Sequence, residues 1–331
     1  MPSFLRACPL ATCLLLAVAC GGRSAEPSPR PTGPTFRRVA DITLTAAADE
    51  VVAQLRQQLV AADRDVVALL DAAATAQLLA ADPVANRHRL VAVVPSGAAK
   101  AAIEAGRLDA AVELADPLGI ATELAALGLA GASLPPAMGD GPTLWTRANL
   151  AAGGQRIAAP ADFVLTTLRN QFAAAARTTE ASLVLVHAAD GDAARREGVV
   201  RAALTNSPRI TLAVRAVTGE PAAFAAAVDA AAGQPHTALL LVTPPGDATA
   251  LATACRAALA AQQLVVTIGS DLPADARSCH VTSDEAAVGR ACGEGVLQIQ
   301  PGGGRIAEVT AATEPATSER RAGFAAALHL P

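Results

Sequence analysis

Short β-rich apolar runs alternate with alanine- and leucine-rich helical runs along almost the whole chain after residue 36. Continuous apolar runs such as "ALLLVT" (Ala238–Thr243) are typical of strands in parallel sheets, which helices cover on both faces. The expected strands are Val39–Leu44, Val66–Asp71, Leu90–Pro95, Leu108–Leu114, Thr143–Trp145, Leu183–His187, Ile210–Val217, Ala238–Thr243, Leu264–Ile268, Cys279–Thr282 and Arg305–Val309. The alternation predicts an α/β protein with doubly wound parallel sheets.

The expected helices between these strands are Ala48–Ala61, Ala98–Ala105, Pro117–Leu129, Phe163–Ala176, Ala193–Leu204, Ala222–Ala232, Thr249–Ala261, Glu285–Ile299 and Ser318–Leu328. The last strand and the last helix raise a question, because such a unit normally packs beside a further strand. Only three residues follow Leu328. The sequence order therefore does not supply the neighbouring strand.

In doubly wound folds, ligands bind beyond the carboxyl ends of the strands. The polar residues at or just beyond the ends of the expected strands are therefore the candidate ligand-binding residues: Asp71, Ser96, His187, Asp190, Asp192, Ser270, Asp271 and Glu285. His187 beside two aspartates could bind a ligand hydroxyl or a cation. The alternative, which we favour, is a solvated turn rich in Asp and Gly.

The amino-acid composition argues against some classes of ligand. Hydrophobic residues make up 52% of the 331 residues but aromatic ones only 2%, with no Tyr and one Trp, Trp145. Few aromatic rings are therefore available to stack on sugars or bases. The formal net charge is −4 and no basic stripe occurs, which argues against a nucleic-acid partner.

The first twenty residues have the pattern of a targeting segment. Arg6 precedes the apolar stretch Leu10–Val18, which is too short to span a bilayer as a stable helix. "LLLAVAC" (Leu14–Cys20) resembles a bacterial lipoprotein box, with Ala17 where Leu is commonest, so we expect acylation at Cys20; the alternative is an ordinary signal peptide. The Pro-, Gly- and Ser-rich composition of Gly21–Thr35 predicts a flexible tether. These features predict a lipid-anchored protein on the periplasmic or cell-surface face of the envelope.

Three cysteines remain after Cys20: Cys255, Cys279 and Cys292. Their spacing fits no zinc pattern, and we expect neither a metal nor another cofactor. A Cys279–Cys292 disulfide is possible, but three buried thiols are preferred. No nucleophile elbow or His pair indicates catalysis, so we expect no enzyme.

Residues 182–324 resemble the first half of a type I periplasmic binding protein, the sugar-type solute receptor of ABC importers. The resemblance lies in "LVLVHAADGDAARREG", in "TALLLVTPPGDATALATACRAALAAQQLVVTIGSD", and in the segments "SDEAAVGR" and "ERRAGFAAAL". The family's second half is also recognisable, but it precedes the first. "RRVADITLTAAADEVVAQLRQQLV" resembles its start, "AIEAGRLDA" its continuation and "GDGPTLWTRANLAA" its closing strand.

The swapped order of the halves predicts a circular permutant, which is tolerated where the old chain ends lie close together. In this interpretation Val39–Leu44 docks beside Arg305–Val309 and supplies the missing strand; the alternative is two unrelated half-domains or a truncated tandem. The expected organisation is a signal peptide at 1–19, a tether at 20–35, lobe 2 at 36–114 and 286–331, a return segment of lobe 1 at 115–135, a closing strand at 136–152, a connector with a helix at 153–181, and lobe 1 at 182–285.

The resemblance implies a small molecule bound between two lobes that close about a hinge near Leu114–Asp116 and Asp284–Glu285, and an ABC permease as partner of a monomer. Several family positions that grip sugars are changed here, such as Gly269 in place of an aspartate and Leu70 in place of an asparagine. Each unpaired ligand hydroxyl costs about 1–3 kcal/mol, so an ordinary monosaccharide is not the expected ligand. The alternative is a degenerate receptor that serves as a protein-interaction module of the envelope.

Overall fold

The computed structural model describes residues 33–44, 50, 53–54, 65–80, 88–311 and 317–331. Pro34–Pro331 form one compact unit. The expected signal peptide, the acylation site at Cys20 and most of the tether lie outside the described residues, as does most of the helix expected at Ala48–Ala61. Within the described part of the chain, no helix is both long and apolar enough to cross a bilayer.

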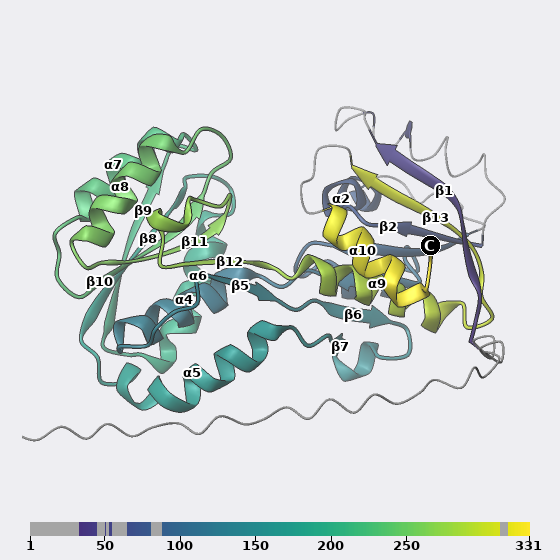
Figure 1. Cartoon of the computed structure of the whole chain (residues 1–331), viewed down its shortest axis with the longest axis horizontal. Helices are drawn as coiled ribbons and strands as arrows, with labels where there is room; N and C mark the ends of the chain where they lie inside the picture. The colour runs from purple at the N-terminus through teal and green to yellow at the C-terminus, as the bar shows by residue number, and fades with distance from the viewer. Residues whose placement is uncertain (1–32, 45–49, 51–52, 55–64, 81–87, 312–316) are drawn as a thin grey trace, which may run out of the picture. The chain divides into compact units, whose positions relative to one another are not determined.

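The first of two sheets has seven strands and contains the first and the last strand of the described chain (Figure 1). Its strands, in spatial order, are β1 (Phe36–Leu44), β13 (Gly304–Ala311), β2 (Val66–Leu69), β3 (Arg89–Val94), β4 (Ala110–Glu113), β6 (Thr143–Thr146) and β7 (Gln155–Arg156). The strands from β1 to β4 are parallel, and β6 and β7 are antiparallel additions at the edge.

β1 supplies the strand that the sequence order lacks. It pairs with β13 in parallel along its whole length, from Phe36 opposite Gly304 to Leu44 opposite Ala311. The predicted pairing of Val39–Leu44 with Arg305–Val309 is therefore confirmed. The purple and yellow arrows that lie side by side in Figure 1 are these two strands.

The second sheet has six strands, all parallel to their neighbours. In spatial order they are β5 (Ala137–Asp140), β12 (Cys279–Ser283), β11 (Leu264–Gly269), β10 (Thr237–Thr243), β8 (Ala181–Ala188) and β9 (Ile210–Val217). With the first sheet it confirms the predicted α/β class with two parallel-dominated sheets.

Helices cover both faces of each sheet, which explains the continuous apolar strands. On the first sheet, α2 (Ala72–Ala80) and α3 (Ala99–Glu104) pack on one face, and α9 (Glu285–Ile299) and α10 (Thr317–Leu328) pack on the other. On the second sheet, α4 (Pro117–Leu129), α5 (Pro160–Ala176) and α6 (Ala193–Ala203) share one core cluster, and α7 (Pro221–Ala231) and α8 (Thr249–Ala260) share the other. Leucine, valine and alanine dominate these four clusters.

The chain passes between the two sheets at four places: after β4, between β5 and β6, between β7 and α5, and between β12 and α9. The expected strand Thr143–Trp145 is β6, and the segment 136–152 also contains a second strand, β5, which lies on the other sheet. Gly141 and Pro142 separate them. Proline cannot donate to a ladder, and a Cβ on Gly141 would overlap the carbonyl oxygen of Ile157.

The three described cysteines are buried free thiols, as the preferred prediction had it. Burial raises the pKa of Cys255 to about 12, that of Cys279 to about 11 and that of Cys292 to about 12. Such thiols carry almost no thiolate near neutral pH and act as small apolar core residues.

A buried carboxylate anchors β1 to β13 and α10. Glu308 on β13 is fully buried, and its Oε1 accepts a hydrogen bond from Arg321 Nε at 2.5 Å. Its Oε2 lies 3.0 Å from Arg38 Nε on β1, but the two atoms are not aligned as a hydrogen bond. Arg321 also pairs with Asp41 on β1. The cluster therefore holds the N-terminal strand by charge as well as by backbone pairing.

Glu308 makes stability depend on pH with a predictable sign. Burial raises its pKa in the folded protein, although Arg321 and Arg38 act in the opposite direction. The stability linked to its protonation is complete below the unfolded pKa and is lost as the pH rises through the folded pKa. We expect Glu308→Gln, which cannot ionise, to flatten the fall in unfolding free energy as the pH rises above the ordinary glutamate pKa of 4.5, measured by urea unfolding. An equally steep fall in the variant would contradict this assignment.

Candidate functional site

The candidate residues on the second sheet follow β8 and β11. His187 lies inside β8 and not in the turn, because the strand continues to Ala188. Its side chain is fully buried, with Nδ1 2.8 Å from the Ala188 carbonyl oxygen, and Nε2 is a buried atom without a hydrogen-bond partner among the described residues. Asp190 and Asp192 lie in the exposed turn that follows, where Asp190 Oδ1 accepts from the Asp192 amide at 2.9 Å.

The turn after β11 is held tightly against the end of β10. Gly269 has φ +88°, and a Cβ there would lie 2.7 Å from the carbonyl oxygen of Thr243. A side chain cannot occupy this place without moving the backbone, which explains the glycine at this position. Ser270 follows, half-buried, and its carbonyl accepts a hydrogen bond from the Thr243 hydroxyl. Asp271 is exposed beyond it.

The remaining candidates lie on the first sheet. β2 ends at Leu69 and not at Asp71 as predicted, because Asp71 precedes α2 and caps its first turn: its Oδ1 accepts from the Ala74 amide at 2.5 Å. Ser96 is exposed after β3, the neighbour of β2. Glu285 is the first residue of α9 and its Oε2 lies 2.6 Å from Arg320 Nη2.

The structure therefore places the candidates in two groups at carboxyl ends of parallel strands. His187, Asp190, Asp192, Ser270 and Asp271 are on the second sheet, with β10 between β8 and β11. Asp71, Ser96 and Glu285 are on the first sheet. Their role in ligand binding stays a prediction.

Arginines that the sequence reasoning did not single out neutralise most of the candidate carboxylates. Arg196 binds Asp190 through two hydrogen bonds of 2.7 and 3.0 Å, and Arg277 binds Asp271 through two of 2.6 and 3.0 Å. In both cases the arginine follows the aspartate by six residues. This Asp-x5-Arg spacing at a strand end is the signal that would have found these pairs.

Arg320 on α10 pairs with Glu285, through Nε at 2.7 Å and Nη2 at 2.6 Å, and a further hydrogen bond joins it to the Leu70 carbonyl. Its side chain is 1% exposed. Burial raises the pKa of Glu285, and Arg320 partly offsets this. The interaction ties α10 to the start of α9 and the end of β2.

The segments that connect the sheets are braced by further charges. Asp116 caps α4 by accepting from the Leu118 amide at 3.0 Å, and Arg195 on α6 binds its other oxygen at 2.5 Å. Between β7 and α5, Arg156 bridges Asp140 and Asp162 and donates to the Gly141 carbonyl at 3.0 Å. Burial raises the pKa of Asp140. Asp140 also accepts from the Asp284 amide through its backbone oxygen at 2.8 Å.

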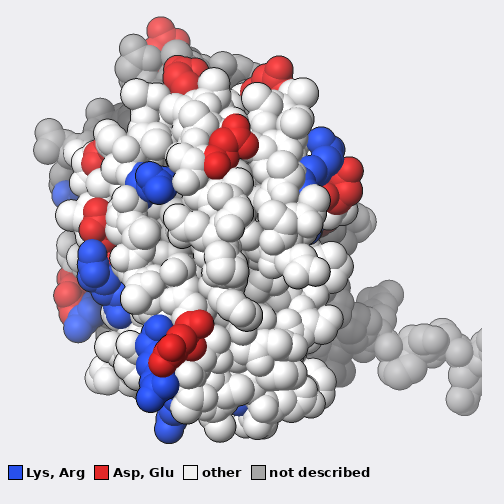
Figure 2. Space-filling view, turned by 90° about the vertical axis from the view of Figure 1, so that its left-hand side faces the viewer, with Lys and Arg blue, Asp and Glu red and all other residues white. Residues whose placement is uncertain are grey.

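The candidate hydroxyl and carboxylate groups can form hydrogen bonds with a ligand. Among the described residues, no three His, Cys, Asp or Glu side chains gather in a group that could hold a metal ion. On the face shown in Figure 2, acidic and basic side chains are scattered and separated by uncharged surface, so this face carries no basic stripe.

Comparison with known proteins agrees with the architecture. No curated protein matches the sequence significantly. The family model described as "Periplasmic binding protein domain" matches residues 158–330, which is more than half of the chain. Members of that family bind small molecules outside the cytoplasm and are generally not enzymes. The chain belongs to the periplasmic binding protein family.

Proposed function

We propose that the protein is an extracytoplasmic solute-binding lipoprotein that holds a small molecule at the carboxyl ends of its parallel strands, as the receptor of an ABC importer. The observation that carries this proposal is the presence of polar side chains at the strand ends of both sheets, where α/β folds bind ligands. Ser96 and Ser270 are the hydroxyl donors of the two groups. Their side chains make no hydrogen bond within the described residues.

The swapped order of the halves is part of this proposal. β1 pairs with β13, and Leu328 and Phe36 share one core cluster, so the end of the chain lies beside the start of β1. Joining them would give the order of an ordinary type I receptor. Closure of two lobes would then bend the chain at the connecting segments near Asp116 and Asp284, and bound ligand would favour the closed form.

A second function is favoured by the arginine pairs. Four of the candidate carboxylates already bind a guanidinium: Asp190, Asp192, Asp271 and Glu285. Displacing such a partner in favour of a neutral hydroxyl is unfavourable. A receptor fold whose strand ends are closed by internal ion pairs would act as a protein-interaction module of the envelope.

Thermal denaturation in the presence of a metabolite library separates the two functions. A ligand of the folded state at about 100 times its Kd adds about 2.7 kcal/mol of stability, so a receptor gives a concentration-dependent rise in Tm with at least one compound. We expect that rise to shrink in Ser96→Ala and Ser270→Ala. The matched control is Ser182→Ala, which lies in β8 at the opposite end of the sheet. A library in which no compound raises Tm would contradict the receptor proposal and support the interaction module.

A further inference from the structure

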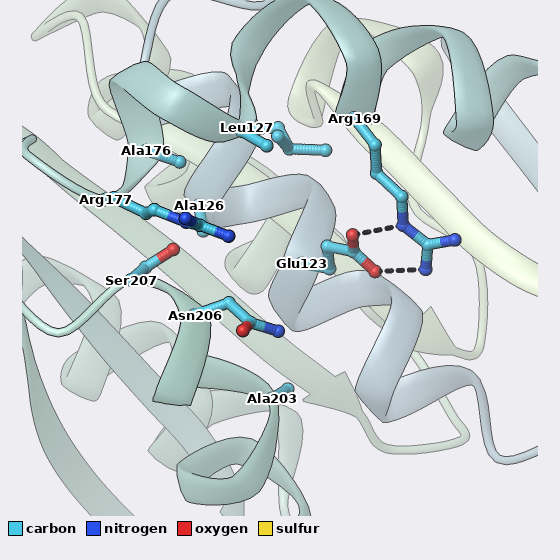
Figure 3. Close-up of a pocket in the computed structure, with 10 residues that line it drawn as sticks. Glu123, Ala126, Leu127, Arg169, Ala176, Arg177, Ala203, Asn206 and Ser207 are labelled. Atoms are coloured by element: carbon cyan, nitrogen blue, oxygen red, sulfur yellow. Dashed lines mark hydrogen bonds and ion pairs between the residues drawn. The ribbon is translucent and has the colours of Figure 1, made fainter.

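A hollow of about 300 Å³ lies between α4, α5 and the turn after α6, away from the strand ends discussed above (Figure 3). Its apolar lining is Ala126 and Leu127 from α4, Ala173 and Ala176 from α5, and Ala203 from α6. Larger side chains at the four alanine positions would fill the hollow, so the small alanine side chains keep it open.

One ion pair in the hollow is complete. Arg169 Nε and Nη2 donate to the two Glu123 carboxylate oxygens at 2.5 and 2.6 Å, a bidentate pair between α5 and α4. This pair neutralises both charges and joins the two helices. Neither group is left to bind a charged ligand.

Three other polar side chains line the hollow: Arg177, Asn206 and Ser207. The Arg177 guanidinium makes no ion pair or side-chain hydrogen bond within the described residues, and the same holds for the Asn206 amide and the Ser207 hydroxyl. Figure 3 shows all three around the hollow, with the Ser207 oxygen directed toward Arg177. Arg177 follows the last turn of α5, where a cation is favourable to the helix dipole. The helix dipole does not explain why the Asn206 amide and the Ser207 hydroxyl also line the hollow.

The charges of the lining leave one net positive charge, that of Arg177, above an aliphatic floor. This arrangement complements a molecule with one anionic head and a short apolar body. A carboxylate would accept hydrogen bonds from Arg177, Asn206 and Ser207, while its chain lay on Ala126, Ala173 and Ala203. We propose that the hollow between α4, α5 and η2 (Leu204–Asn206) is a second binding site, for a small aliphatic carboxylate, independent of the proposed solute site.

Hexanoate is a suitable probe, and amide chemical shifts of the ¹⁵N-labelled chain report where it binds. We expect saturable shifts at Arg177, Asn206 and Ser207. Arg177→Gln is expected to weaken binding about tenfold or more, because it removes a charge-assisted hydrogen bond, and Ala203→Leu is expected to abolish it by filling the hollow. Arg147→Gln is the matched control: Arg147 is also exposed and has no acidic partner in the described part of the chain, but it lies after β6 on the first sheet.

Two further probes test the head group. Hexanamide has the same shape without the charge and is expected to bind about tenfold more weakly, and hexylamine is expected not to bind. The proposal is overturned if hexanoate gives no saturable shift at these amides, if it shifts the strand-end residues instead, or if hexanamide or the Arg177→Gln chain binds equally well.

Discussion

Replacing Gly289 by alanine is expected to lower the free energy of unfolding by about 3 kcal/mol or more. A Cβ at this position of α9 would overlap the carbonyl oxygen of Arg320 and would lie 2.8 Å from the Phe324 amide nitrogen on α10. A Cβ on Gly323 of α10 would likewise overlap the carbonyl oxygen of Ala286. The two helices therefore touch backbone to backbone, and a methyl group must push them apart and loosen Phe324 in the core.

The control for this prediction is Gly198→Ala on α6, where a Cβ would meet no atom within 4 Å. That substitution is expected to stabilise the protein by about 0.5–1 kcal/mol, because alanine loses less backbone entropy in a helix. Chemical denaturation of both variants gives the comparison. Equal effects of the two substitutions would contradict the close contact of α9 and α10.

Arg320→Met is expected to cost about 3–5 kcal/mol, because removal of one partner from a buried ion pair leaves the other charge uncompensated. Glu285 is 14% exposed and would lose the guanidinium that favours its charged form, and the Leu70 carbonyl would lose a donor. Urea unfolding at neutral pH measures the loss.

The double variant Arg320→Met with Glu285→Gln tests whether the loss of stability comes from the unpaired charge. It removes the stranded charge and is expected to recover at least half of the lost stability. Arg256→Met on α8 breaks an exposed pair with Asp275 and is expected to change stability little, because exposed pairs are screened by solvent. A double variant no more stable than Arg320→Met would show that Arg320 acts by packing and not by charge.

The helices with strong end signals were predicted closely from the sequence. α4 and α9 have the predicted bounds, and in both an aspartate precedes the first turn and accepts a backbone amide, from Leu118 in one case and Ala287 in the other. Continuous apolar strands such as β10 were also found within a residue or two. Local patterns determine these elements, so the sequence alone suffices.

Contacts between distant segments were harder to predict. β5 and β7 are too short for a periodic pattern, and α2 was missed because the helix signal of Asp71 followed by alanines was taken as a strand end. The partner of Arg320 lies 35 residues away on another helix. The hollow lined by Ala126, Ala173 and Ala203 depends on how three helices pack, which no stretch of sequence shows.

The central claim is that the chain forms a single type I receptor fold whose two halves occur in exchanged order along the sequence. A chain that restores the ordinary order would begin at Thr179, join Pro331 to Pro34 through a short Gly/Ser linker and end at Thr178, with the cut in the turn between α5 and β8. Its thermal unfolding, compared with that of residues 34–331 in their natural order, is the direct measurement. We predict a single cooperative transition with a similar Tm; absence of a cooperative transition for every linker length, while the natural order unfolds cooperatively, would contradict the claim.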